Sequence, residues 1–162
     1  MEASQAERQP VVDLSRLRPA EYAGFVAAAV LFISLFLPWF SAPENPANAS
    51  INGEKGELNA FQTYVSLDWL LVAACSAPFI LAYIIVRRHE LSWRPGEVTA
   101  IVGLTAFVLI FCNGVAFGKP GEPDSEISFG IGWFLGLGAA AGIALSGFFR
   151  QLKGVGRKPP GV

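Results

Sequence analysis

The stretch GIGWFLGLGAAAGIALSGFF, residues 130–149, decides how we interpret the rest of this sequence. It is uncharged throughout, and at about 1.5 Å per residue a helix of this length matches the roughly 30 Å hydrocarbon core of a bilayer. Each of its six glycines would destabilise a helix in water by roughly 0.5–1 kcal/mol relative to alanine. In lipid, small residues instead let neighbouring helices approach closely. The stretch therefore predicts a membrane-spanning helix with a packing face.

Three more apolar runs predict helices over about 20–40, 67–86 and 97–117. Pro19 and Glu21 suit the start of the first helix, and Ser66 with Asp68 suits the start of the second. The first run exceeds the apolar core of a signal peptide, so we interpret it as an uncleaved anchor. The predicted fold class is all-α: a polytopic membrane protein with four transmembrane helices in a bundle and short polar external loops.

The composition agrees with a membrane protein. Hydrophobic residues make up 52% and charged residues 15% of the 162 residues, against about 45–50% and 25% in soluble domains, and the mean hydropathy is +0.45. The net charge of −1 leaves no basic surplus, so nucleic acid is not an expected partner. The expected organisation is a cytoplasmic segment over 1–18, a transmembrane domain over 19–150 and a cytoplasmic tail over 151–162.

Lysine and arginine predict the orientation. Ten of them lie in the termini and the loop after the second helix, and only Lys55 and Lys119 lie in the other two loops. Cytoplasmic loops carry the excess of these residues, so both termini are predicted to face the cytoplasm. The two external loops then hold seven acidic residues and two lysines, a net charge of −5.

Tryptophans and a turn signal refine this prediction. Trp39, Trp69 and Trp133 mark the outer ends of three helices and Trp93 an inner end, as an interfacial belt would, although stacking on a ligand is an alternative. Asn52-Gly53 predicts a hairpin with arms near 49–51 and 58–61.

Candidate site residues are few and point to packing. Gly132, Gly136, Gly138 and Gly142 form two small-xxx-small pairs that pack helices either within one molecule or between subunits. Asn113 lies in an apolar run, so we expect an interhelical hydrogen bond, with a pore-lining role as the alternative. Asp68 is either a helix-start acid or an external polar contact that pairs with Lys55 or Lys119.

The sequence contains no motif for catalysis, a cofactor or a metal. His89 is the single histidine and has no nearby cysteine or second histidine, so no usual zinc site is expected. No nucleophile elbow, zinc-protease motif or phosphate-binding glycine loop is present. We therefore expect no enzyme activity, and external carboxylates such as Glu54 and Glu57 give only a weak case for a membrane enzyme.

The segments LFLPWF (35–40), NAFQ (59–62) leading into VSLD (65–68), and Gly132-Trp133 together resemble uncharacterised four-helix integral membrane proteins of actinobacteria. The resemblance covers about residues 20–150, although that group often carries a tryptophan where this chain has Phe61. It implies the same four-helix topology and no catalytic residue.

The expected function is that of a small integral protein of the cell membrane. We expect a non-enzymatic accessory or scaffold subunit, and the alternative is a component of a transporter or channel. The expected partners are the lipid bilayer and either a second copy of the chain or another membrane protein.

Overall fold

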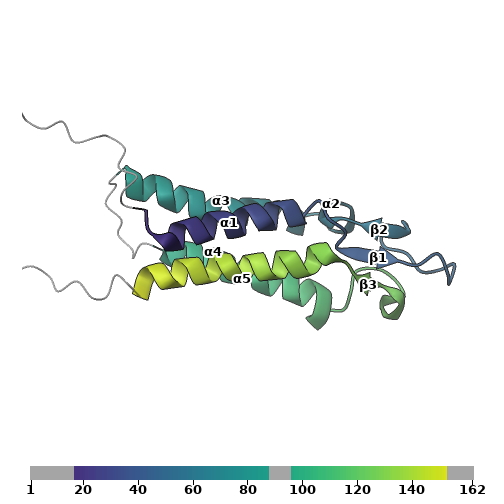
Figure 1. Ribbon diagram of the computed structural model, residues 1–162. Helices are drawn as coiled ribbons and strands as arrows, with labels where there is room; N and C mark the ends of the chain where they lie inside the picture. Colours follow the sequence, from purple (N-terminus) through teal and green to yellow (C-terminus); the bar gives the residue numbers. More distant parts are fainter. Residues whose placement is uncertain (1–16, 88–95, 153–162) are drawn as a thin grey trace, which may run out of the picture.

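Four helices lie side by side in this protein and carry a small sheet at one end (Figure 1). The computed structural model describes residues 17–87 and 96–152. The helices are α1 (Pro19–Ser34), α3 (Leu67–Val86), α4 (Glu97–Phe111) and α5 (Ile131–Leu152). The chain is therefore mostly helical. The expectations for residues 1–16, His89, Trp93 and the tail from residue 153 lie outside the described residues.

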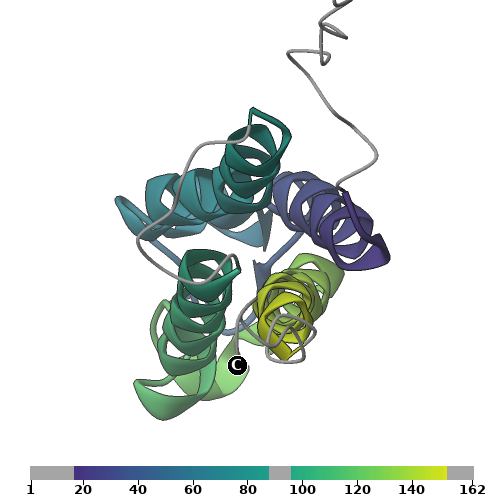
Figure 2. The same ribbon diagram turned by 90° about the vertical axis from the view of Figure 1, so that its left-hand side faces the viewer.

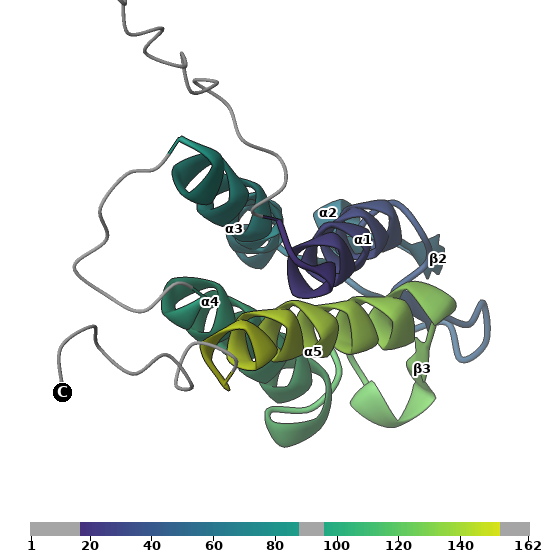
Figure 3. The same ribbon diagram turned by 60° about the vertical axis from the view of Figure 1, so that its left-hand side comes forward.

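The helices surround a common core in the order α1, α3, α4 and α5 (Figure 2). Consecutive members of this ring pack against one another, and α5 lies between α1 and α4 (Figure 3). Leu31, Leu71, Ile110 and Ile143 from the four helices are fully or almost fully buried. We call the end where α1 begins and α5 ends the base.

Three of the helices are long and apolar enough to cross a membrane. They are α3 over 20 residues, α4 together with the π-helical turn η2 (Cys112–Ala116), also 20 residues, and α5 over 22 residues. Pro78 lies inside α3, and the helix continues through it from Leu67 to Val86.

The first helix is shorter than the sequence predicts, because it ends at Ser34 rather than near residue 40. Pro38 has no N–H to continue the helix, and its ring would clash with the carbonyl of Ser34. That carbonyl instead accepts a hydrogen bond of 2.7 Å from Trp39 Nε1. The chain turns there and enters the sheet.

The loops at the end opposite the base form one folded unit, which we call the cap (residues 38–66 and 118–130). Its strands are β1 (Phe40–Ala42), β2 (Gly56–Leu58) and β3 (Ser128–Phe129), with β1 in the centre and antiparallel to both neighbours. The short helices α2 (Ala60–Thr63) and η3 (Asp124–Glu126) complete it. Two loops that are far apart in the sequence thus share one sheet.

The hairpin prediction is right at the turn and wrong in its arms. Asn52 and Gly53 both have positive φ angles, 51° and 83°, and Ile51 pairs with Glu54 across them. Leu58, however, pairs with Phe40 of β1 rather than with residues 49–51. The Asn52 side chain fixes the turn by donating to the carbonyls of Gln62 and Thr63.

The tryptophan belt is wrong for two of its members. Trp39 is 0% and Trp133 4% exposed, whereas Trp69 is 67% exposed. The Phe129 ring of the cap packs against the Trp133 ring, with ring centroids 4.5 Å apart and the ring planes tilted by 42°. These rings therefore join the cap to the helices instead of lying at a lipid surface.

Candidate functional site

Helix α5 contacts both of its neighbours through glycine. A Cβ at Gly136 would lie 2.8 Å from the Trp39 ring, and one at Gly142 would lie 3.0 Å from Ala27 of α1. On the other side, a Cβ at Gly147 would collide with the backbone of Ala100 in α4. These glycines let α1 and α4 approach α5 closely.

The four predicted packing glycines do not behave alike. A Cβ at Gly132 would lie 2.5–2.9 Å from the Trp39 ring and from the carbonyl oxygens of Pro38 and Ser34. Gly132 therefore packs within this chain, as Gly136 and Gly142 do. A Cβ at Gly138 would meet no atom within 4 Å, and this residue lines an open, shallow groove between α1 and α5. Gly138 is exposed, whereas the next residue, Ala139, is buried. The predicted packing role of Gly138 within the chain is therefore wrong.

Sequence analysis missed Gly103 on α4. A Cβ there would collide with the backbone of Ala144 and lie 2.9 Å from the backbone carbon of Ile143, both in α5. Gly103 and Gly147 thus close the α4–α5 contact from both sides. A lone glycine in an apolar run was the only signal available for it.

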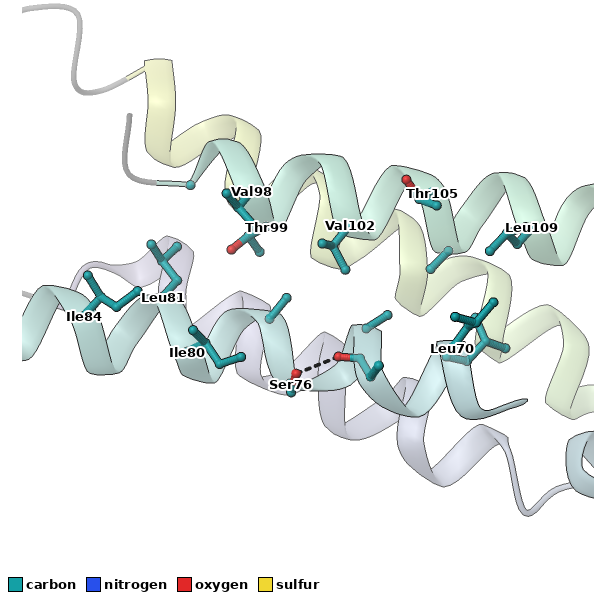
Figure 4. A pocket seen from close by; sticks show the side chains of 16 residues that line it. Leu70, Ser76, Ile80, Leu81, Ile84, Val98, Thr99, Val102, Thr105 and Leu109 are labelled. Atoms are coloured by element: carbon teal, nitrogen blue, oxygen red, sulfur yellow. Dashed lines mark hydrogen bonds between the residues drawn. The ribbon is translucent and has the colours of Figure 1, made fainter. Parts of the chain in front are cut away.

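Helices α3 and α4 meet differently, across an apolar groove of about 450 Å³. Figure 4 shows side chains of both helices directed into it, among them Leu70, Ile80 and Ile84 of α3 and Val98, Val102 and Leu109 of α4. Ser76, Thr99 and Thr105 contribute its few polar groups, and the Ser76 hydroxyl donates to the carbonyl of Ala73 in its own helix. We call this feature the α3–α4 groove.

A buried ion pair lies at the base. Arg150 Nε of α5 is 3.0 Å from Glu21 Oε1 of α1, and the two side chains are 12% and 2% exposed. The other carboxylate oxygen accepts a hydrogen bond of 2.7 Å from the Arg18 backbone N–H at the start of α1. Among the described residues, Arg150 Nη1 is buried without a hydrogen-bond partner.

A small chamber of about 10 Å³ lies beside this pair. Thr99 and Ser146 line it together with Glu21 and Arg150, and its volume is enough for about one water molecule. Leu81 and Thr99 line both the chamber and the α3–α4 groove, so the two spaces are neighbours.

The sequence offered a partial signal for the ion pair. Glu21 lies in the first turn of α1 and Arg150 in the last turn of α5. When two neighbouring helices are antiparallel, the first turn of one and the last turn of the other lie at the same end of the bundle. Which helices are neighbours is a tertiary property, so the pairing was missed.

Asp68 lies in the first turn of α3, which confirms the prediction of a helix-start acid, whereas the alternative prediction of an external polar contact is wrong. Asp68 is 3% exposed, and its Oδ1 has no hydrogen-bond partner within the described chain, so it is no external polar contact. The two lysines expected to pair with it donate to backbone carbonyls instead, Lys55 to Glu44 and Lys119 to Ile127. Because both acceptor carbonyls belong to the cap, these hydrogen bonds hold the lysines away from α3.

The Asn113 amide bonds within its own helix, because Nδ2 donates to the Leu109 carbonyl at 2.9 Å. The predicted interhelical bond of its side chain is therefore wrong. Its backbone carbonyl makes the tertiary contact and accepts a hydrogen bond of 3.0 Å from the Tyr64 hydroxyl. Burial raises the pKa of Tyr64 above its ordinary value, so this phenol stays a donor at neutral pH.

No metal site emerges from residues 17–87 and 96–152, where no group of three or more histidine, cysteine or acidic side chains could hold an ion. Cys75 and Cys112 are free thiols.

Comparison with known proteins adds no assignment, since no protein-family model and no curated protein sequence matches the chain. The resemblance to actinobacterial membrane proteins accordingly stays a prediction.

Proposed function

We propose that this chain is an integral membrane protein that crosses the bilayer four times and acts as an accessory or scaffold subunit. Support for the membrane comes first from the outward helix faces. They carry exposed large apolar side chains on every helix, such as Val26 on α1, Phe79 on α3, Ile101 on α4 and Leu145 on α5, which are 51–65% exposed. Patches of this extent mark contact with lipid or protein.

The short helix α1 is proposed as the fourth span. Its 16 residues rise about 24 Å, and the turn over Leu35–Leu37 extends the apolar segment by hydrogen bonds such as Leu37 N–H to the Ser34 carbonyl. It also lies alongside the three longer helices (Figure 1). A modest thinning of the bilayer offsets the remaining mismatch.

The proposed orientation places the base in the cytoplasm and the cap outside. Arg18 precedes α1, Arg87 follows α3 and Arg150 lies in the last turn of α5. These helix ends lie at the base (Figure 1), in agreement with the excess of lysine and arginine in the termini and middle loop. Six acidic side chains are exposed on the cap: Glu44, Glu54, Glu57, Glu122, Asp124 and Glu126.

The observation that carries the scaffold proposal is the folded cap on an apolar interior. The cap has its own buried side chains, Phe40, Ile51, Leu58 and Ile127, and presents a fixed acidic surface. In the described chain, the buried polar side chains of α1, α3, α4 and α5 are Ser34, Asp68 and the three that line the chamber at the base, Glu21, Thr99 and Ser146. The rest of the core is apolar, and the chamber is only about 10 Å³. This interior favours a scaffold over a conducting pore.

Impermeant thiol labelling in intact cells tests the topology. In a background of Cys75→Ala and Cys112→Ser, we expect Asn48→Cys and Ser125→Cys to react and Ser92→Cys to react only after permeabilisation. The reverse pattern would overturn the orientation. Labelling of Ser92→Cys and Ser125→Cys from the same side would overturn the four-span topology.

Reconstitution in liposomes tests the scaffold against the alternative, a transporter or channel component. We expect no solute or ion flux above that of empty liposomes. Flux that depends on Asn113 or Asp68 would overturn the scaffold proposal. Purification in mild detergent followed by mass spectrometry should then identify a partner whose recovery falls when the exposed acids of the cap are changed to their amides.

A further inference from the structure

We propose that the α3–α4 groove binds one acyl chain of an anionic phospholipid from the leaflet at the base, with its phosphate next to Arg150. The inference rests on the membrane location proposed above and goes beyond the scaffold role. It joins two neighbouring features, an apolar groove and a cation with an unused hydrogen-bond donor.

The groove has the dimensions of a lipid-chain site. Its volume of about 450 Å³ falls within the roughly 300–1,000 Å³ of small-molecule pockets. Its lining on α3 extends from Leu70 to Ile84, about 21 Å along the helix, which exceeds the roughly 15 Å of one hydrocarbon leaflet. In lipid, no hydrophobic driving force closes such a groove, so a chain of matching shape is its natural occupant.

The base of the groove leads to a cation. Gly96 lines the groove, and a Cβ on it would lie 2.9 Å from Arg150 Cβ. Leu81 and Thr99 line both the groove and the chamber, and Arg150 also lines the chamber. A chain lying in the groove would therefore bring its headgroup to the neighbourhood of Arg150.

Charge favours an anionic headgroup. Glu21 contacts Arg150 Nε, but within the described chain Nη1 is buried and has no hydrogen-bond partner. Guanidinium groups bind phosphate through paired N–H donors. Arg18, at the start of α1, and Arg87, at the end of α3, add positive charge at the same end of the helices. A phosphate with no compensating cation thus fits better than a zwitterionic headgroup.

Two matched tryptophan variants of the full chain test the groove. Val102→Trp fills the groove, while Ile101→Trp adds the same ring on the adjacent, outward-facing position of α4. With purified protein and phosphatidylglycerol, native mass spectrometry should show one bound lipid for wild type and Ile101→Trp and about tenfold less for Val102→Trp.

A second matched pair tests the cation. Glu21→Gln and Glu21→Gln/Arg150→Gln both lack the ion pair, but only the first keeps the guanidinium. We expect Glu21→Gln to prefer phosphatidylglycerol over phosphatidylcholine of identical chains. The double variant should lose about tenfold of this preference, as expected for one charge-assisted hydrogen bond.

Three results would overturn the proposal. Equal binding of both lipids by wild type that Val102→Trp leaves unchanged would indicate adventitious lipid only. Conversion of a dimer to a monomer by Val102→Trp would assign the groove to a second copy of the chain. An unchanged lipid preference in the double variant would show that the headgroup does not lie next to Arg150. None of these results affects the scaffold proposal, which depends on the cap and on flux.

Discussion

The two sides of α4 differ in how they meet a neighbouring helix. Toward α5, Gly103 and Gly147 let backbone lie against backbone. Toward α3, side chains such as Val102 and Leu109 face Leu70 and others across about 450 Å³ of open space. Both faces are apolar, so hydrophobicity alone does not distinguish them.

The difference indicates what brings two helices into close contact in lipid. Because lipid chains are as apolar as the side chains, association depends on van der Waals contact, and glycine brings backbones close enough to supply it. The α3–α4 side lacks facing glycines in its central part, and a groove remains. Substitutions on the two sides of α4 and on the facing helices should therefore differ in their effect on stability.

The largest effect is expected for Gly147→Leu. Its side chain would have to occupy space held by the backbone of Ala100 and by the Gly96 carbonyl, 2.6 Å from a Cβ, and backbone cannot rotate away. We expect a loss of stability at or above the upper end of the roughly 1–3 kcal/mol typical of overpacking. Thermal unfolding in detergent measures it.

The matched control is Gly138→Leu, because a Cβ there meets no atom within 4 Å. We expect a change within about 0.5 kcal/mol. Equal destabilisation by both variants would show that contact with α4 does not set the cost, because leucine has a higher helix propensity than glycine and would not by itself destabilise either helix position.

A smaller effect is expected for Gly136→Leu on the α1 side of α5. Here the obstacle is the Trp39 ring, 2.8 Å from a Cβ, and a side chain can shift where backbone cannot. We expect about 1–3 kcal/mol of destabilisation with a change in tryptophan fluorescence. If the variant instead lost only a dimer, with the monomer still folded, this glycine would belong to a subunit interface.

The sequence was informative where structure is local and apolar. The helices expected over 67–86 and 130–149 correspond to α3 and α5, Leu67–Val86 and Ile131–Leu152, because long apolar runs bounded by polar loops have few alternatives. The first helix was overextended, since Leu35–Phe40 continues the apolar run although Pro38 ends the helix before it.

The cap and the groove could not be predicted in the same way. The pairing of Phe40 with Phe129 joins residues separated by most of the chain, and strands of two or three residues show no alternation. Trp39 and Trp133 were assigned to lipid because sequence position alone gives depth and not burial. A groove depends on how two helices approach, which no local pattern encodes.

An effect of about 1 kcal/mol is expected for Tyr64→Phe. The Tyr64 hydroxyl donates to the Asn113 carbonyl and so connects the segment before α3 to the end of α4, at the outer end of the loosely packed side. The variant removes this hydrogen bond, and chemical denaturation should report the loss.

The pH dependence of stability provides a second test of the Tyr64 hydroxyl. Because burial raises the pKa of folded Tyr64 above its usual value of 10.0, this group contributes its full stabilisation below that value and loses it as the pH rises further. Wild type should therefore lose more stability than Tyr64→Phe between pH 9 and pH 11, a range of about two pH units around the ordinary phenol pKa. Parallel pH curves for the two proteins would contradict the role of this phenol.

The smallest effect is expected for Ala73→Leu, which adds three carbons at the groove. Ala73 is exposed and lines the open side of α3, so the larger side chain meets space that lipid otherwise fills, and stability should change by less than about 0.5 kcal/mol. Ala140→Leu adds the same carbons on α5, where Ala140 is 0% exposed, and should cost about 1–3 kcal/mol. Thermal unfolding of the two variants side by side measures the contrast. If Ala73→Leu cost as much as Ala140→Leu, the α3–α4 side would be closed in the membrane, and the difference between the two faces of α4 would vanish.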